Sequence, residues 1–187
     1  MECPAIYELP DLILGVILII GFFKGKNSIV GGFYPALLAG LTFLSSSTVQ
    51  LFLGIHLEVL EFLAMLIFMT IPEKFLRRSG SKRFSYITFG LIVIITSLIV
   101  DIKGDVSYFR VGTLLFLSVM MAKVYLHPEV AGEGVAEPLA LSSGFALLGV
   151  VALVLGFRVF SSFLYFASVL LLMMITIERG TELRART

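Results

Sequence analysis

Long apolar tracts recur along the chain, and short polar segments separate them. A helix needs about 20 apolar residues to cross a hydrocarbon core roughly 30 Å thick. The composition agrees, since 58% of the 187 residues are hydrophobic, 14% are charged and the mean hydropathy is +1.04. Soluble domains carry about 25% charged residues, so this composition is typical of membrane proteins. The sequence therefore predicts an all-α, polytopic membrane protein built as a single helix bundle.

Seven transmembrane helices are expected. The tracts lie at about residues 12–23, 29–44, 49–71, 84–100, 106–126, 139–157 and 159–177. The first tract is short, so we expect it either to include Ile6–Leu9 or to thin the bilayer locally. If residues 139–177 formed a broken hairpin that did not cross fully, the number of helices would be six.

The basic residues predict the orientation of these helices. With the N-terminus outside, eleven Lys and Arg residues fall in the cytoplasmic loops and tail. Three fall on the outer side, namely Lys103, Arg110 and Arg158. Short loops rich in Lys and Arg stay in the cytoplasm. We therefore expect a multi-pass protein of the cell membrane with its N-terminus outside and its C-terminus in the cytoplasm.

The segment before the first tract is acidic. It contains Glu2, Glu8 and Asp11 and no Lys or Arg, the reverse of the basic start of a signal peptide. The first tract is therefore expected to be a retained helix.

No catalytic or cofactor motif is recognisable in the sequence. Cys3 is the only cysteine, which excludes a disulfide framework and a thiolate metal site. Only His56 and His127 provide imidazoles, and no nucleophile–base set is visible. We expect no cofactor and no nucleic-acid partner, and an enzyme is the least favoured class of function.

Two glutamates in the third tract are the most informative polar residues. Glu61 is expected near the middle of its span, with Glu58 one turn closer to the outside. Because they are three residues apart, they share one flank of a helix. A charged carboxylate in the hydrocarbon core costs about 3 kcal/mol or more, so both should face the bundle interior, and one is expected to be protonated at neutral pH. Such groups suit proton or cation coupling; the alternative is a structural role, hydrogen-bonded to hydroxyls such as Thr96 or Ser97, or ion-paired.

Arg110 and His56 complete the set of proton- or cation-responsive candidates. Arg110 lies at a depth comparable to that of Glu58, so the two are predicted to pair and to leave Glu61 as the titrating group. His56 projects from another side of the helix than either glutamate and is expected near the outer mouth. His56, Glu58 and Glu61 therefore do not converge as a metal site.

Candidate contact surfaces lie on one helix and in two loops. Gly32, Ala36 and Gly40 recur every four residues, a pattern that lets helices approach closely within the bundle or in a homo-oligomer. The basic segment 72–83 and the acidic segment 127–138 both lie on the predicted cytoplasmic side. They are candidate contacts for a protein partner, and the lipid bilayer is expected around the helices.

The second and sixth tracts contain similar segments, GFYPALL at 32–38 and GFALL at 144–148. Under the predicted topology these tracts cross the membrane in the same direction. A parallel duplication of three helices, joined by one linking helix, is one interpretation, and chance similarity between apolar segments is the other.

Two functions are consistent with these patterns. The first is a small transporter, or the membrane subunit of a transport complex, that uses Glu61 with Glu58 as its proton- or cation-responsive group. The alternative is a seven-helix sensor or scaffold that acts through a cytoplasmic or membrane partner. The tail 178–187 is too short for an output domain, so this alternative requires a partner.

Overall fold

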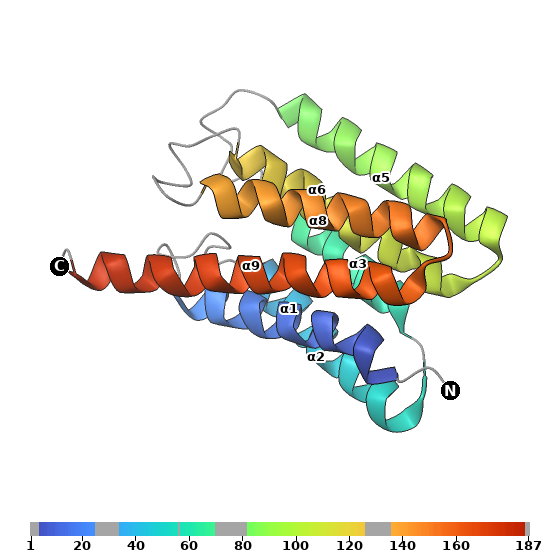
Figure 1. Cartoon of the computed structure of the whole chain (residues 1–187), viewed down its shortest axis with the longest axis horizontal. Helices are drawn as coiled ribbons and strands as arrows, with labels where there is room; N and C mark the ends of the chain where they lie inside the picture. The colour runs from blue at the N-terminus through green and yellow to red at the C-terminus, as the bar shows by residue number, and fades with distance from the viewer. Residues whose placement is uncertain (1–3, 25–33, 56, 70–81, 126–135, 186–187) are drawn as a thin grey trace.

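The computed structural model of the chain describes residues 4–24, 34–55, 57–69, 82–125 and 136–185. Within these residues the fold is all-α, as predicted, with seven α-helices and one 3₁₀ helix. In chain order they are α1 (Pro4–Lys24), α2 (Tyr34–Leu53), α3 (Glu58–Met69), α5 (Lys82–Lys103), η3 (Val106–Phe109), α6 (Arg110–Tyr125), α8 (Ala136–Val154) and α9 (Arg158–Ala185). Successive helices run up and down, so α1 begins at one end of the bundle and α9 ends at the other (Figure 1).

Two of the described helices are long and apolar enough to cross a membrane, judged by length and composition. They are Tyr34–Leu53 and Glu137–Val154, which are α2 and most of α8. Shorter apolar helical stretches occupy Val106–Ala122 and Arg158–Met174. The described helices thus match the predicted number of seven, while the hydropathy criterion is met by two of them.

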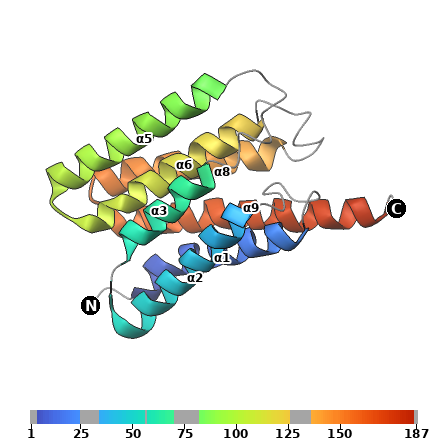
Figure 2. The same ribbon diagram turned by 180° about the vertical axis from the view of Figure 1, so that it is seen from behind.

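The bundle consists of two groups of three helices with α5 at the edge. In the N-terminal half, α2 packs against both α1 and α3, and in the C-terminal half α8 packs against both α6 and α9. The halves meet along two seams, where α1 packs on α9 and α3 packs on α6 (Figure 2). A duplication of three helices would make α1, α2 and α3 equivalent to α6, α8 and α9. The α1–α9 seam would then be equivalent to the α6–α3 seam, and both are present, so the packing agrees with that interpretation.

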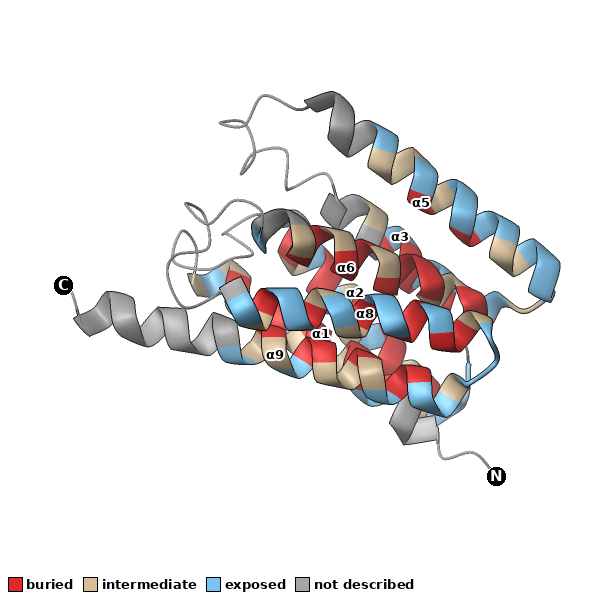
Figure 3. Ribbon diagram, turned by 45° about the horizontal axis from the view of Figure 1, so that its top comes forward, coloured by how far each residue is buried: buried red, intermediate tan, exposed pale blue. Residues whose placement is uncertain are grey.

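Helix α5 is the least enclosed part of the bundle. Its described contacts run mainly to η3 and α6. Only Ile92 and Thr96 are buried among its described side chains, and most others are exposed (Figure 3). The helix therefore links the halves and contributes little to the core beyond Ile92.

The boundary between the second and third predicted tracts is different in the structure. Residues 45–48 were expected between these tracts, yet they lie inside α2. The Ser45 and Thr48 hydroxyls donate to the carbonyl oxygens of Leu41 and Leu44, four residues back, at 2.8 and 2.6 Å. These hydroxyls form hydrogen bonds with the backbone of their own helix, so they do not end it.

Glycines mark the turns instead. Gly54 has a φ of 67° and ends α2, so the predicted tract 49–71 is divided between α2 and α3. Gly156, with a φ of 92°, ends α8, and the next N–H, that of Phe157, donates to the Ala152 carbonyl at 2.8 Å. Residues 139–177 are therefore two packed antiparallel helices and not one interrupted element.

The first helix extends further toward the N-terminus than the apolar tract. It begins at Pro4, where a missing N–H costs little, so it includes the expected extension over residues 6–9. Pro10 was expected at the helix start but lies inside α1.

Serine pairs join the helices of the C-terminal half. Ser142 of α8 and Ser168 of α9 each donate to the carbonyl oxygen of the other residue at 2.9 Å. Ser118 of α6 and Ser143 of α8 do the same at 3.1 and 2.9 Å. Small hydroxyl side chains of this kind allow close helix packing and hydrogen-bond across it.

Helices α1 and α2 approach each other closely at a pair of glycines. A Cβ atom on Gly40 would lie 2.8 Å from the Gly15 carbonyl oxygen, and one on Gly15 would lie 2.9 Å from that of Gly40. Ala36 is completely buried, and Gly32 lies outside the described residues. The described part of the small-residue stripe therefore packs within the chain, and a homo-oligomer, which stays a prediction, would need another surface.

We expect Gly40→Ala to destabilise the protein by about 1–3 kcal/mol, because the added methyl group meets backbone that cannot move cheaply. Gly144→Ala on α8 is the matched control, since a Cβ there meets no atom within 4 Å. The control should stabilise the helix by up to about 1 kcal/mol. Thermal or denaturant unfolding in detergent measures both effects, and equal stability of the two variants would contradict the α1–α2 packing.

Candidate functional site

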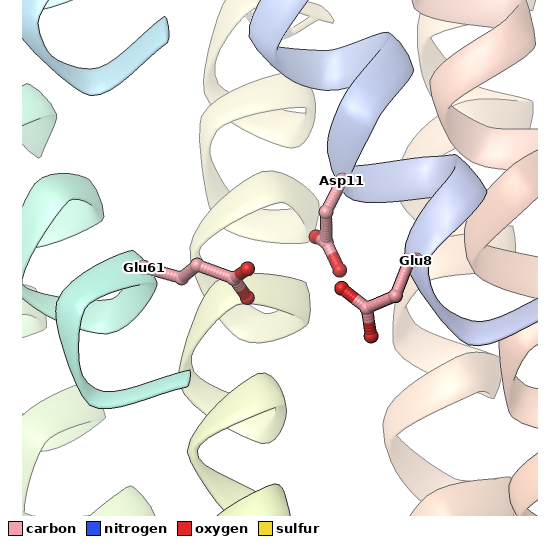
Figure 4. A group of neighbouring side chains, drawn as sticks. All are labelled: Glu8, Asp11 and Glu61. Carbon is pink, nitrogen blue, oxygen red and sulfur yellow. The ribbon is translucent and has the colours of Figure 1, made fainter. Parts of the chain in front are cut away.

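A cluster of acidic side chains is buried where the two halves meet. Glu8 and Asp11 of α1 are 0% exposed, and Glu58 and Glu61 of α3 are 4% and 3% exposed. Figure 4 shows the carboxyl groups of Glu8, Asp11 and Glu61 turning toward one another. One oxygen from each of these three lies within 4.8 Å of the others. All four carboxyl groups come from the N-terminal half.

Arg110, the first residue of α6, supplies positive charge from the C-terminal half. Its Nη2 donates to Asp11 Oδ2 at 2.7 Å and to Glu8 Oε1 at 3.1 Å. Its side chain is 11% exposed, and its charge also acts on Glu61. One guanidinium therefore binds two carboxyl groups of α1 across the seam.

Two hydroxyl groups bind the same cluster. Tyr165 of α9 is 1% exposed, and its hydroxyl donates to Asp11 Oδ1 at 2.5 Å. Ser46 of α2 donates to Glu61 Oε1 at 2.6 Å. Asp11 thus accepts one hydrogen bond on each oxygen, both from the C-terminal half, while Glu61 is bound from its own half.

The helix arrangement explains why these residues meet. Helices α1, α3, α6 and α9 all begin at the same end of the bundle (Figure 1). Each contributes a polar residue from its first two or three turns, the deepest being Asp11 and Tyr165. At a rise of 1.5 Å per residue, the cluster lies about 10 Å or less below the helix starts. The first turn of a helix carries partial positive charge, which favours the carboxylates of Glu58 and Glu61 in the first turn of α3.

The position of Glu58 and Glu61 differs from the prediction. They were expected near the middle of a span over 49–71, but both lie in the first turn of α3. The reason is the turn at Gly54, which ends α2 and restarts the helix at Glu58. The cluster therefore lies toward one end of the bundle, the end that the predicted topology places outside.

Three of the four candidate residues from the sequence lie in or beside the cluster. They are Glu58, Glu61 and Arg110, and His56 lies outside the described residues. The charge of Glu58 acts on both acidic residues of α1. The two ion pairs described for the guanidinium of Arg110 run to α1. The predicted pairing of Glu58 with Arg110 stays a prediction.

Four further residues of the cluster were not among the candidates. Glu8 and Asp11 entered only as evidence against a signal peptide, although they are three residues apart, the spacing of the two glutamates of α3. That repeated spacing is a signal that the sequence offered. Ser46 and Tyr165 gave none, since single hydroxyls in apolar tracts are common. The hydroxyl that donates to Glu61 is that of Ser46. Thr96 and Ser97, the donors suggested from the sequence, lie on α5, where Thr96 is buried and Ser97 is exposed.

The cluster has more acidic than basic groups. Among the described residues, Glu8, Asp11 and Glu61 lie around one guanidinium, so full ionisation of these three groups would place two more negative charges there than Arg110 balances. Each buried charge without a partner costs several kcal/mol, which favours a proton or a cation at these three groups. The close carboxylate oxygens would suit a cation, but Arg110 already donates to two of the three groups. At about 4 Å its guanidinium would repel a unit charge by about 4 kcal/mol.

A second ion pair lies between the same helix ends. Arg158 Nη2 and Asp105 Oδ2 are 2.6 Å apart, with side chains 42% and 35% exposed. The Ser107 N–H donates to Asp105 at 2.9 Å, and this hydrogen bond, aided by Arg158, lowers the pKa of Asp105. The pair ties the start of α9 to the connection between α5 and η3.

Comparison of the chain with models of protein families, with curated proteins and with solved structures gives no match. The chemistry of the cluster therefore carries the functional interpretation.

We expect Arg110→Gln to destabilise the protein by about 3–5 kcal/mol, because it leaves buried carboxylates without their counter-charge. In an Asp11→Asn background the same substitution should cost at least about 1 kcal/mol less. Denaturant unfolding of the four proteins in this cycle measures the coupling.

Arg158→Gln is the control for that cycle. Its ion pair is as short but well exposed, so the loss should be only about 0–1 kcal/mol. If Arg110→Gln costs the same with and without Asp11→Asn, the two residues do not interact across the seam.

Proposed function

We propose that this chain is a small multi-pass membrane protein in which the buried cluster binds protons or cations during transport. It would act either as a transporter or as the membrane subunit of a transport complex. The observation that carries the proposal is that three buried carboxyl groups, those of Glu8, Asp11 and Glu61, lie around the one guanidinium described beside them, at the seam between two halves of the bundle.

The distribution of polar and apolar side chains supports a lipid environment. Large apolar side chains are exposed on each of α1, α2, α3, α5, α8 and α9, while the acidic cluster and most described serines of the bundle are buried. Phe157, Phe160 and Phe163 are examples, each more than half exposed. In water such continuous apolar surface would drive association, whereas lipid tails accommodate it. Together with the basic residues, this supports seven crossings in the cell membrane with the N-terminus outside.

The position of the cluster supports coupling between charge and movement. The carboxyl groups come from α1 and α3, and Arg110 and Tyr165 come from α6 and α9. A change in the charge of the carboxyl groups therefore changes the attraction between the halves. In transporters built from repeats, one half moves against the other around a site at their interface.

Reconstituted protein offers the direct test. Liposomes with an imposed pH gradient and a trapped pH-sensitive dye should show protein-dependent proton or cation movement. Glu61→Gln should reduce it, because one titratable group of the cluster is removed. Glu137→Gln, at an exposed carboxyl group in the first turn of α8, is the control and should behave like wild type. The proposal would be contradicted by two results together. The wild type would show no flux, and the stability of Glu61→Gln would be the same at about pH 5 and pH 8.

A sensor or scaffold is the second candidate, and the enclosure of the cluster favours it. Side chains that are 0–4% exposed can change their protonation and thereby the helix packing without an ion crossing the membrane. Such a protein needs a partner, for which the segments 72–83 and 127–138 provide basic and acidic charge. Cross-linking in native membranes should then capture a partner that is lost when Glu129 and Glu133 are replaced by Gln. Flux without such a partner would exclude this candidate.

A further inference from the structure

We infer that the ligand of the cluster is a proton and that Glu8 is the group that binds and releases it. This rests on the proposed function in one respect, namely that the cluster is the functional site. The sequence pointed to Glu58 and Glu61, so the structure moves the exchangeable site to another helix. The hydrogen bonds of Asp11, Glu8 and Glu61 provide the argument.

Asp11 is the member whose hydrogen bonds most favour the ionised form. Its Oδ1 accepts from Tyr165 and its Oδ2 accepts from Arg110. A guanidinium has only donors, and it stays charged in proteins. A proton on either oxygen of Asp11 would therefore displace an existing donor, and the shorter contact of Arg110, 2.7 Å against 3.1 Å for Glu8, assigns its charge to Asp11.

Glu8 has the opposite pattern. Its side chain is completely buried and points into the cluster (Figure 4), and only Oε1 is bound, by the longer contact to Arg110. Its Oε2 has no hydrogen-bond partner among the described residues. An ionised oxygen in this position would lack both water and a donor, which disfavours the anion. A protonated Oε2 becomes a donor, and oxygens of Asp11 and Glu61 lie within 4.8 Å as acceptors.

The charged and titratable groups around Glu8 favour the proton on balance. From the elements packed at this site they are Asp11 on α1, Glu58 and Glu61 on α3, Arg110 on α6 and Tyr165 on α9. The carboxylates attract a proton, and Arg110 opposes it. Arg110 would also repel a metal ion at the same place, whereas a proton on Glu8 needs no space beside the guanidinium. At Glu61 the Ser46 hydroxyl donates a hydrogen bond, which stabilises the ionised form of that carboxyl group.

Release of the proton would place two anions on one guanidinium. Glu8 would then repel Glu61, since a carboxyl oxygen of each lies within 4.8 Å of the other, and would compete with Asp11 for Arg110. The charge of Glu8 therefore acts in both halves, because ionisation adds repulsion from Glu61 within the N-terminal half and attraction to Arg110 across the seam.

Infrared difference spectroscopy of the full-length protein in lipid tests this inference, because a protonated carboxyl group has its own C=O band that shifts in heavy water. Wild type should gain such a band as the pH falls from about 8 to 5. The band should be absent in Glu8→Gln and present in Glu58→Gln, Glu61→Gln and the exposed control Glu137→Gln. A band that survives in Glu8→Gln, or disappears in Glu58→Gln or Glu61→Gln instead, overturns the inference.

A measurement on the wild type covers the case in which Glu8→Gln does not fold. The carboxyl carbon of isotope-labelled Glu8 should change its NMR chemical shift through the same titration, and a constant shift overturns the inference. Loss of the protonated band on addition of sodium or calcium at fixed pH would identify a cation as the ligand and would also overturn it. If Glu8 titrates but the liposomes show no flux, only the transport proposal is contradicted. If the liposomes show flux but Glu8 does not titrate, only this inference is contradicted.

Discussion

The guanidinium of Arg110 is the interaction on which the site depends. It stands at the start of α6 and holds two carboxyl groups of α1, so a single positive charge connects the two three-helix halves of the bundle. Tyr165 reinforces the link by binding Asp11 from α9. The same guanidinium compensates only part of the acidic charge beside it. The same cluster therefore holds the two halves together and favours protonation of the carboxyl groups that Arg110 does not balance.

The rest of the structure follows from placing that cluster inside an apolar protein. Its members are turned inward and are nearly free of exposed surface, while large apolar side chains cover the outside of most helices. Within each half, helices also use small residues and hydroxyl groups for close packing, as at Gly15, Gly40 and the serine pairs. In lipid these contacts replace the hydrophobic effect as the source of helix association. The acidic cluster is tolerated because neighbouring helices supply its donors.

The sequence predicted the features that depend on local hydropathy, and it failed where partners are distant. The all-α fold and the number of helices follow from apolar tracts, each of which can be recognised without knowledge of the others. The boundary near residues 45–48 was wrong because serine and threonine hydroxyls can bond to their own helix. Glu8 and Asp11 were missed as site residues because the partners of Asp11 lie 99 and 154 residues away along the chain. Glu61 and Arg110 were found because a charge inside an apolar tract is unusual in itself.

The contact between Arg110 and Asp11 in a lipid bilayer is the most direct test of this account. Solid-state NMR can measure the dipolar coupling between the labelled guanidinium nitrogens of Arg110 and the labelled carboxyl carbon of Asp11 in reconstituted protein. The account requires a coupling that corresponds to direct hydrogen-bond contact, as in the 2.7 Å separation of Nη2 and Oδ2. A coupling too weak for contact, in protein that is folded and embedded in lipid, would show that the halves are not joined by this charge.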